Sequence, residues 1–121
     1  MPFDWGEYHH LAIDLKENPE NFREACLRSS VSRTYYAVYH HVKIFVFHKY
    51  SKSFSNVPGS HGKIISCLKE NNKFDIAKDF IKLKELREAC DYEDEIDDID
   101  RVVKDAFTTS EKLFRIIQNK K

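Results

Sequence analysis

The sequence predicts an all-α protein that folds as an up-and-down bundle of four to five helices. The 121 residues include only three Gly and three Pro, so few tight turns interrupt the chain. Apolar side chains recur at helical spacing along most of the sequence, and no segment alternates as a half-buried strand does. A chain of this length can bury one core, so we expect a single domain over residues 1–121.

The first helix is expected from about residue 5 to 17, with Asp4 as a candidate N-cap. Asn18 and Pro19 end it, because proline removes a backbone donor and restricts the residue before it. Its inward face is expected to contain Tyr8, Leu11, Ala12 and Leu15.

The second helix is expected from about residue 20 to 50. It is apolar on most sides, which is typical of the central helix of a bundle. One stripe along it contains Phe22, Cys26, Ser29, Arg33, Tyr36, His40 and Phe47. Much of the remaining surface is formed by Val31, Tyr35, Val38, Val42, Phe45 and Val46.

Residues 51–60, SKSFSNVPGS, have the composition of a loop, and we expect this loop to be mobile. A short third helix is expected over about residues 60–70, with Ser60 as its candidate N-cap. Its inward residues are expected to be Ile64, Ile65 and Leu68.

Two further helices are expected, over about residues 75–90 and 94–119. The inward stripe of the fourth reads Ile76, Phe80, Leu83, Arg87 and Cys90. The fifth repeats apolar and small residues close to a heptad pattern, at Ile96, Ile99, Val103, Ala106, Ser110, Leu113 and Ile117.

The charge distribution argues against a broad nucleic-acid-binding surface. The formal net charge is zero, and residues 91–100 contain seven acids without a Lys or Arg. At the start of a helix such acids favour the positive end of the helix dipole, and they also suit a basic protein partner. Any RNA binding must therefore depend on a local groove.

Other features point to a cytoplasmic protein without cofactor or metal. No apolar run approaches the roughly 20 residues of a membrane span, and the N-terminus lacks a signal-peptide pattern. The three cysteines lack CxxC spacing and suit reduced core positions. The pairs His9–His10 and His40–His41 point in different directions on a helix and rarely bind one metal together.

Six residues form the candidate site. Arg33, Tyr36 and His40 follow one another at i, i+3 and i+7 on the second helix. On the fourth helix Arg87 falls on the inward stripe, and Asp91 and Tyr92 follow it.

Two interpretations of these six residues stay open. One is a buried ion-pair network that fixes helix register, with Asp91 as partner of either arginine. The other is a groove for phosphate or RNA, with arginine on the phosphate, tyrosine for stacking and His40 as acid or base.

Three segments resemble the HEPN domain family, in particular its small stand-alone prokaryotic members. They are FREACLRSSVSRTYYAVYHHVK, SHGKIISCLKE and LKELREACDYEDEI, and the resemblance spans roughly residues 5–115. It implies a helical bundle that usually dimerises. The family includes metal-independent ribonucleases of toxin–antitoxin and defence systems, partners of minimal nucleotidyltransferases, and non-catalytic proteins that bind nucleotides or RNA.

The resemblance also bears on activity. Catalytic members carry an arginine with a histidine four to six positions later, and Arg87 matches that arginine. Residues 91–93 are Asp91, Tyr92 and Glu93, and no histidine follows His61, which we expect to cap or pack. A salt-bridged aspartate is a poor base because its pKa is lowered. A non-catalytic component that binds RNA or a nucleotide is therefore the leading expectation.

Two alternatives from other classes remain. One is a metal-independent ribonuclease that uses Arg87 with His40 and Asp91. The other is an accessory subunit that only binds protein, such as a minimal nucleotidyltransferase. In each case the aromatic surplus of the second helix leads us to expect a homodimer.

Overall fold

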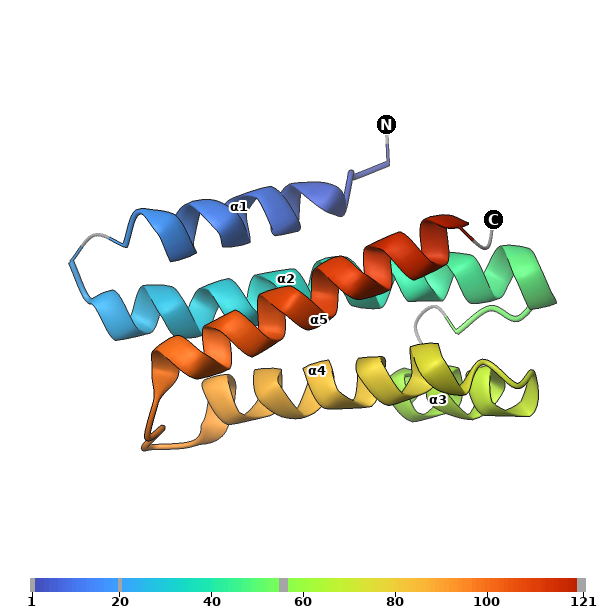
Figure 1. Cartoon of the computed structure of the whole chain (residues 1–121). Helices are drawn as coiled ribbons and strands as arrows, with labels where there is room; N and C mark the ends of the chain where they lie inside the picture. Colours follow the sequence, from blue (N-terminus) through green and yellow to red (C-terminus); the bar gives the residue numbers. More distant parts are fainter. Residues whose placement is uncertain (1, 20, 55–56, 120–121) are drawn as a thin grey trace.

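The computed structural model describes residues 2–19, 21–54 and 57–119, which form five helices and no strand (Figure 1). The helices are α1 (Gly6–Glu17), α2 (Arg23–Tyr50), α3 (Ser60–Glu70), α4 (Phe74–Tyr92) and α5 (Ile99–Asn119). The prediction of an all-α helical bundle is confirmed.

Helix α2 is the centre of the molecule, as its apolar sequence predicts. It packs against each of the other four helices, and α4 packs in addition against α3 and α5. Helix α1 lies along α2, on the side away from α3 and α4 (Figure 1). Buried apolar residues from all five helices form one core cluster. Every residue of α2 from 30 to 43 is therefore buried or half-buried, whereas exposed residues occur toward both ends of the helix.

The buried face of α2 is the predicted set that contains Val31 and Tyr35, and not the stripe that contains Arg33 and Tyr36. Val31, Tyr35, Val38, Val42 and Val46 are fully buried. The other stripe is only partly covered: Arg33, Tyr36 and His40 are half-buried, and its ends are exposed. This half-covered stripe lies on a seam of the bundle, which makes its polar side chains reachable from solvent.

The inward stripes of α3, α4 and α5 are largely as predicted. Every residue of the α4 stripe is buried, including Arg87, and so are Ile64 and Leu68 of α3. The α5 stripe is buried from Val103 onward. The predicted inward face of α1 is partly wrong, because Ala12 is buried whereas Leu11 is 44% exposed.

Helix α1 begins slightly later than predicted. Its N-cap position is Trp5, and the carboxylate of Asp4 accepts a hydrogen bond from the backbone N–H of Gly6 at 2.9 Å. Asp4 therefore does satisfy a donor of the first turn, from one position further out.

Helix α3 does not use Ser60 as its N-cap, which corrects the prediction. The cap position is Gly59, at φ +71°, a backbone conformation that glycine adopts without strain. The hydroxyl of Ser60 instead shares a hydrogen bond of 2.8 Å with the hydroxyl of Tyr39. The expected loop before α3 is non-helical at 51–54 and 57–59, and residues 55–56 lie outside the described part of the chain.

Helix α5 begins at Ile99 and not near residue 94, which is a second correction. Residues 93–98 are non-helical, and Arg28 of α2 holds their start. Its guanidinium donates hydrogen bonds to the backbone carbonyls of Cys90 at 3.2 Å and Glu93 at 2.6 Å. Asp98 then accepts a hydrogen bond from the backbone N–H of Arg101, so it acts as a local cap. Residues 93–98 are thus held by hydrogen bonds to Arg28, where the apolar periodicity predicts the first turn of the helix.

None of the five described helices is both long and apolar enough to cross a membrane. Cys26, Cys67 and Cys90 are free thiols, and the latter two are buried. Burial raises the pKa of Cys90 to about 11, so this thiol stays protonated at neutral pH.

Candidate functional site

Arg87 is the centre of the candidate site. It belongs to the inward stripe of α4 and is only 7% exposed. Its guanidinium carbon lies 5.0 Å from the ring centroid of Tyr35 and 5.3 Å from that of Tyr36, so two α2 rings enclose the charge. Such cation–π contacts compensate part of the cost of burying an arginine.

Asp91 is the partner of Arg87. Its Oδ2 accepts a hydrogen bond from Nη1 of Arg87 at 3.3 Å and one from the hydroxyl of Ser32 at 3.5 Å. Arg33 lies elsewhere, with its guanidinium carbon 5.1 Å from the ring centroid of Tyr8 on α1. The structure therefore decides which arginine interacts with Asp91, a choice that the sequence left open.

His61 joins this cluster from the first turn of α3. Its Nδ1 is hydrogen-bonded to the hydroxyl of Tyr35, and its ring stacks on Tyr39 with centroids 4.4 Å apart. Burial first, and then the charge of Arg87, lower the pKa of His61. The imidazole is therefore neutral at pH 7 and can accept a proton or a hydrogen bond.

Sequence reasoning missed the role of His61 and of Tyr35. The i, i+4 spacing of Tyr35 and Tyr39 on α2 indicates two hydroxyls on one face. No spacing within the chain indicates that α3 places a histidine against that face, because the intervening loop sets its position.

His40 lies on the same seam but on the side of α1. Its imidazole stacks on the indole of Trp5, with centroids 3.4 Å apart and planes 10° from parallel. Burial first, and then the charge of Lys43 and His61, lower the pKa of His40 to about 4. Its Nδ1 is buried and has no hydrogen-bond partner among the described residues. His40 is therefore neutral at pH 7, with one ring nitrogen that accepts no hydrogen bond from residues 2–19, 21–54 or 57–119.

Tyr92 is apart from the others. It lies in the last turn of α4 and is 75% exposed. Of the six predicted residues, the structure brings Tyr36, Arg87 and Asp91 together, and it adds Tyr35 and His61 to them. Arg33 and His40 lie on the α1 side of the same α2 stripe.

The arrangement combines a buried cation with neutral hydrogen-bonding rings. Burial raises the pKa of the Tyr35 hydroxyl, which therefore stays protonated at any physiological pH. Such a set can bind an anion through the guanidinium and exchange a proton through an imidazole. Within residues 2–19, 21–54 and 57–119, no group of three or more His, Cys, Asp or Glu is placed to hold a metal ion.

Comparison with protein-family models, with curated proteins and with solved structures finds no match to this chain. The function of the site is therefore inferred from its geometry alone.

Proposed function

We propose that this chain is a HEPN-like module that binds the phosphate of RNA or of a nucleotide without cleaving it. In this proposal it is a cytoplasmic component of a prokaryotic toxin–antitoxin or defence-type system. Arg87 is the phosphate-binding group, Asp91 orients it, and Tyr36 provides an aromatic surface beside it.

The observation that carries the proposal is the incomplete hydrogen bonding of Arg87. A guanidinium has five N–H donors, and within the described residues those of Arg87 reach only the carboxylate of Asp91 and the hydroxyl of Tyr35. Its Nε is buried and has no hydrogen-bond partner in that part of the chain. Arginine in a partly dehydrated setting binds phosphate strongly and with defined geometry, because two parallel N–H groups meet two oxygens.

Asp91 supports the same proposal through its exposure. Its side chain is 27% exposed, compared with 9% for the side chain of Arg87. The carboxylate thus covers the solvent side of the ion pair, where an incoming phosphate would compete with it. Ser32, its second partner, would hold Asp91 as the guanidinium turns to the phosphate.

Binding of a short single-stranded RNA tests this function, measured by fluorescence anisotropy in EDTA with Arg87→Lys. Lysine keeps the charge and most of the buried volume but loses the paired donors, so we expect affinity to fall about tenfold or more. The control is Arg101→Lys, an exposed arginine on α5. Unchanged binding by a folded Arg87→Lys variant contradicts the proposal.

A second candidate is the metal-independent ribonuclease, and the position of His61 favours it. Family ribonucleases pair their arginine with a histidine, and here the Arg87 segment has Asp91 instead. His61 adjoins this segment through Tyr35, which contacts both the imidazole and the guanidinium. An imidazole that is neutral at pH 7 has a ring nitrogen that can accept the proton of a ribose hydroxyl.

Cleavage of RNA in EDTA separates the two candidates. If the ribonuclease is correct, His61→Ala abolishes cleavage, whereas the exposed His48→Ala leaves it unchanged. The cleavage rate of His40→Ala shows whether the residues on the α1 side of the α2 stripe contribute to cleavage. No cleavage by the wild-type protein at high concentration leaves the binding function as the conclusion.

A homodimer and a protein partner belong to the same proposal. Phe3, Ile44 and Phe47 are 47%, 42% and 51% exposed, and Ile44 lines a shallow hollow with each of the other two. Aromatic and aliphatic side chains of this kind are typical of helix-on-helix interfaces. Light scattering should give a dimer mass, which Phe47→Glu should reduce to a monomer mass. The acidic run of residues 91–100 is the surface offered to a basic partner such as a minimal nucleotidyltransferase.

A further inference from the structure

The groups that close Arg87 off from solvent differ in how firmly they are held. The side chain of Arg87 is only 9% exposed. Tyr35 and Tyr36 belong to the central helix α2, and Asp91 lies one turn further along α4. His61, in contrast, comes from the short helix α3, and its imidazole bonds to the Tyr35 hydroxyl that the guanidinium also reaches. A ligand that approaches the guanidinium must displace one of these neighbours.

The first turn of α3, residues 59–63, has few of the features that stabilise the start of a helix. Its N-cap is Gly59, which has no side chain to bond the free backbone N–H groups. None of the five residues is acidic, so no carboxylate interacts with the positive end of the helix dipole. Gly62 follows in the same turn, and glycine loses more conformational freedom in a helix than any other residue. This turn can therefore open at low cost.

The remainder of α3 is firmly anchored. Ile64, Cys67 and Leu68 are buried in the core. At the other end of the helix, the side-chain amide of Asn71 donates a hydrogen bond of 2.8 Å to the carbonyl of Cys67. A weakly stabilised first turn is thus joined to a fixed helix, and the hinge between them lies just before Ile64.

The contacts that hold the first turn closed go to two tyrosines of α2. The imidazole of His61 bonds to the hydroxyl of Tyr35 and stacks on the ring of Tyr39, with centroids 4.4 Å apart. The hydroxyl of Ser60 shares a hydrogen bond of 2.8 Å with that of Tyr39. Contacts of this kind shift an equilibrium by a modest factor each, so they favour the closed turn without locking it.

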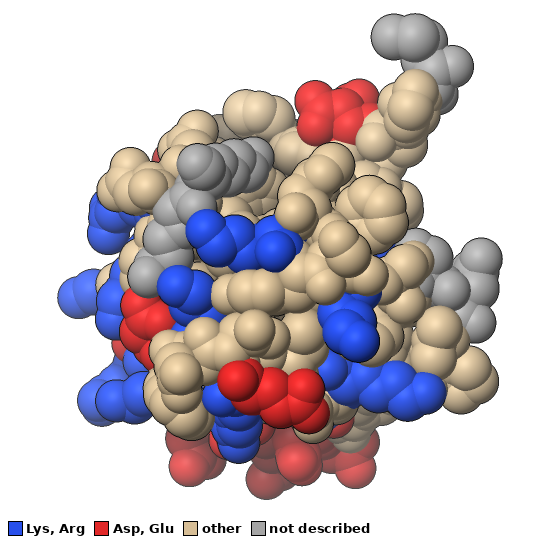
Figure 2. All heavy atoms as spheres, turned by 90° about the vertical axis from the view of Figure 1, so that its right-hand side faces the viewer, with Lys and Arg blue, Asp and Glu red and all other residues tan. Residues whose placement is uncertain are grey.

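The outer surface of α3 is polar. Its exposed residues include Lys63, Ser66, Lys69 and Glu70. Lys and Arg side chains are spread over this end of the molecule with acidic groups among them (Figure 2). Such side chains stay hydrated whether the first turn is closed or open, so they do not oppose its movement.

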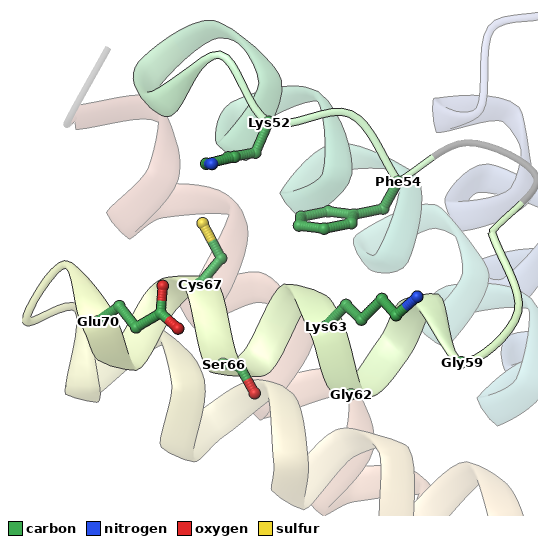
Figure 3. Close-up of a pocket in the computed structure, with 8 residues that line it drawn as sticks. All are labelled: Lys52, Phe54, Gly59, Gly62, Lys63, Ser66, Cys67 and Glu70. Atoms are coloured by element: carbon green, nitrogen blue, oxygen red, sulfur yellow. The ribbon is translucent and has the colours of Figure 1, made fainter.

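Free space lies on the side of the first turn that is opposite to His61. A hollow of about 600 Å³ separates α3 from the loop before it, and Gly59, Gly62 and Lys63 line it (Figure 3). At about 100° per residue, Gly59 and Lys63 point roughly opposite to His61. A Cβ added at either glycine would meet no atom of another part of the described chain within 4 Å. The turn can therefore move away from Arg87 without a steric clash.

We propose that residues 59–63 form a flap that opens to give a ligand access to Arg87. In the open state the flap moves into the hollow, and His61 leaves the hydroxyl of Tyr35. The guanidinium and this hydroxyl then face solvent together. The flap is a property of the chain and not of a particular ligand, so it does not depend on the function proposed for Arg87.

Reaction with phenylglyoxal, a reagent for accessible guanidinium groups, tests the flap in the absence of a ligand. Mass spectrometry follows the modification of Arg87, and the exposed Arg101 is the internal standard. We expect Arg87 to react at least about tenfold more slowly than Arg101, because it reacts only when the flap is open. Low urea concentrations should leave the rate unchanged, because a local opening exposes little new surface.

Two substitutions should change the opening in opposite directions. Gly62→Ala strengthens the first turn, so the reaction of Arg87 should slow about fivefold, which reflects the difference in helix propensity between glycine and alanine. Tyr39→Phe keeps the aromatic ring but removes the hydroxyl that bonds to Ser60, so the reaction should accelerate about fivefold.

Ser66→Ala and Tyr92→Phe are the matched controls. Ser66 lines the same hollow beyond the hinge, and Tyr92 is 75% exposed at the end of α4. Each control should change the rate at Arg87 by no more than about twofold. Because no ligand is present, the flap can fail this test while phosphate binding by Arg87 holds, and the reverse is equally possible.

Three results overturn the proposal. Equal rates at Arg87 and Arg101 would mean that nothing restricts access. A rate that Gly62→Ala and Tyr39→Phe leave unchanged would mean that the reagent enters by another route, such as displacement of Asp91. A rate that rises with urea in step with global unfolding would mean that Arg87 becomes accessible only when the whole chain unfolds.

Discussion

The indole of Trp5 lies parallel to the imidazole of His40, with ring centroids 3.4 Å apart. Trp5 precedes α1 and His40 belongs to the middle of α2, so this stack fixes the start of one helix on the other. It also covers one face of a histidine whose pKa is lowered to about 4. The contact thus links the packing of α1 to the chemistry of the half-covered α2 stripe.

Removal of the stack should loosen α1 and expose His40. We expect Trp5→Ala to lower the free energy of unfolding by about 1–3 kcal/mol, since a half-buried aromatic and a stacked pair are lost. The pKa of His40 should rise toward the ordinary 6.5, because burial is the main cause of its depression. Urea unfolding and an NMR titration of the imidazole measure the two effects. Phe22→Ala, at an aromatic position that is 83% exposed, is the control and should change stability by no more than about 0.5 kcal/mol.

The protein should become less stable as the pH falls, because His40 titrates at a lower pH in the folded state than in the unfolded state. The unfolded imidazole takes up a proton near pH 6.5, whereas the folded one does so only near pH 4. Above pH 6.5 both states are neutral, and between these values the unfolded state binds more protons, so acidification destabilises the fold. The loss of stability from pH 7.5 to pH 5 should be smaller in His40→Gln than in the wild type. An equal loss in both proteins would show that other groups cause it, and His48→Gln, at an exposed position, provides the comparison.

Arg28 should anchor the segment between α4 and α5. Its guanidinium donates to the carbonyls of Cys90 and Glu93 and forms an ion pair of 3.0 Å with Glu24. Arg28→Ala leaves the two carbonyls without this donor, so we expect a loss of about 1–3 kcal/mol. Hydrogen exchange of residues 93–98 should accelerate at the same time. Arg23→Ala removes an ion pair on a side chain that is 57% exposed and should cost less than about 1 kcal/mol.

The hydroxyl of Tyr35 should matter more than that of Tyr92. Tyr35 is fully buried and hydrogen-bonded to His61, so Tyr35→Phe leaves a histidine nitrogen without its partner. We expect this change to destabilise the protein by about 1–2 kcal/mol in urea unfolding. Tyr92→Phe, at a position that is 75% exposed, should have no measurable effect on stability. A similar cost at both positions would mean that the Tyr35–His61 contact contributes nothing to the fold.

Much of the fold could be predicted because helices are local. The apolar spacing of residues 75–90 predicts that Arg87 lies on the buried stripe of α4, and it does. The same reasoning fails at the start of α5, where periodicity predicts a helix from about residue 94. There the carbonyl of Glu93 bonds to Arg28, a residue 65 positions away, which no local pattern records.

The candidate site, too, could be predicted from the sequence only in part. The sequence by itself determined the helical class, the central place of α2 and the residues that line its stripe, because hydrophobic periodicity is written along the chain. Only the tertiary structure decided that Asp91 pairs with Arg87 and not with Arg33. Only the tertiary structure placed His61 against Tyr35 as well. The Tyr35–His61 contact joins two helices, so the packing of whole helices sets it. Spacing along α4 allows the i,i+4 pair of Arg87 and Asp91, but only the packing of the helices places Arg33 elsewhere, against Tyr8 of α1.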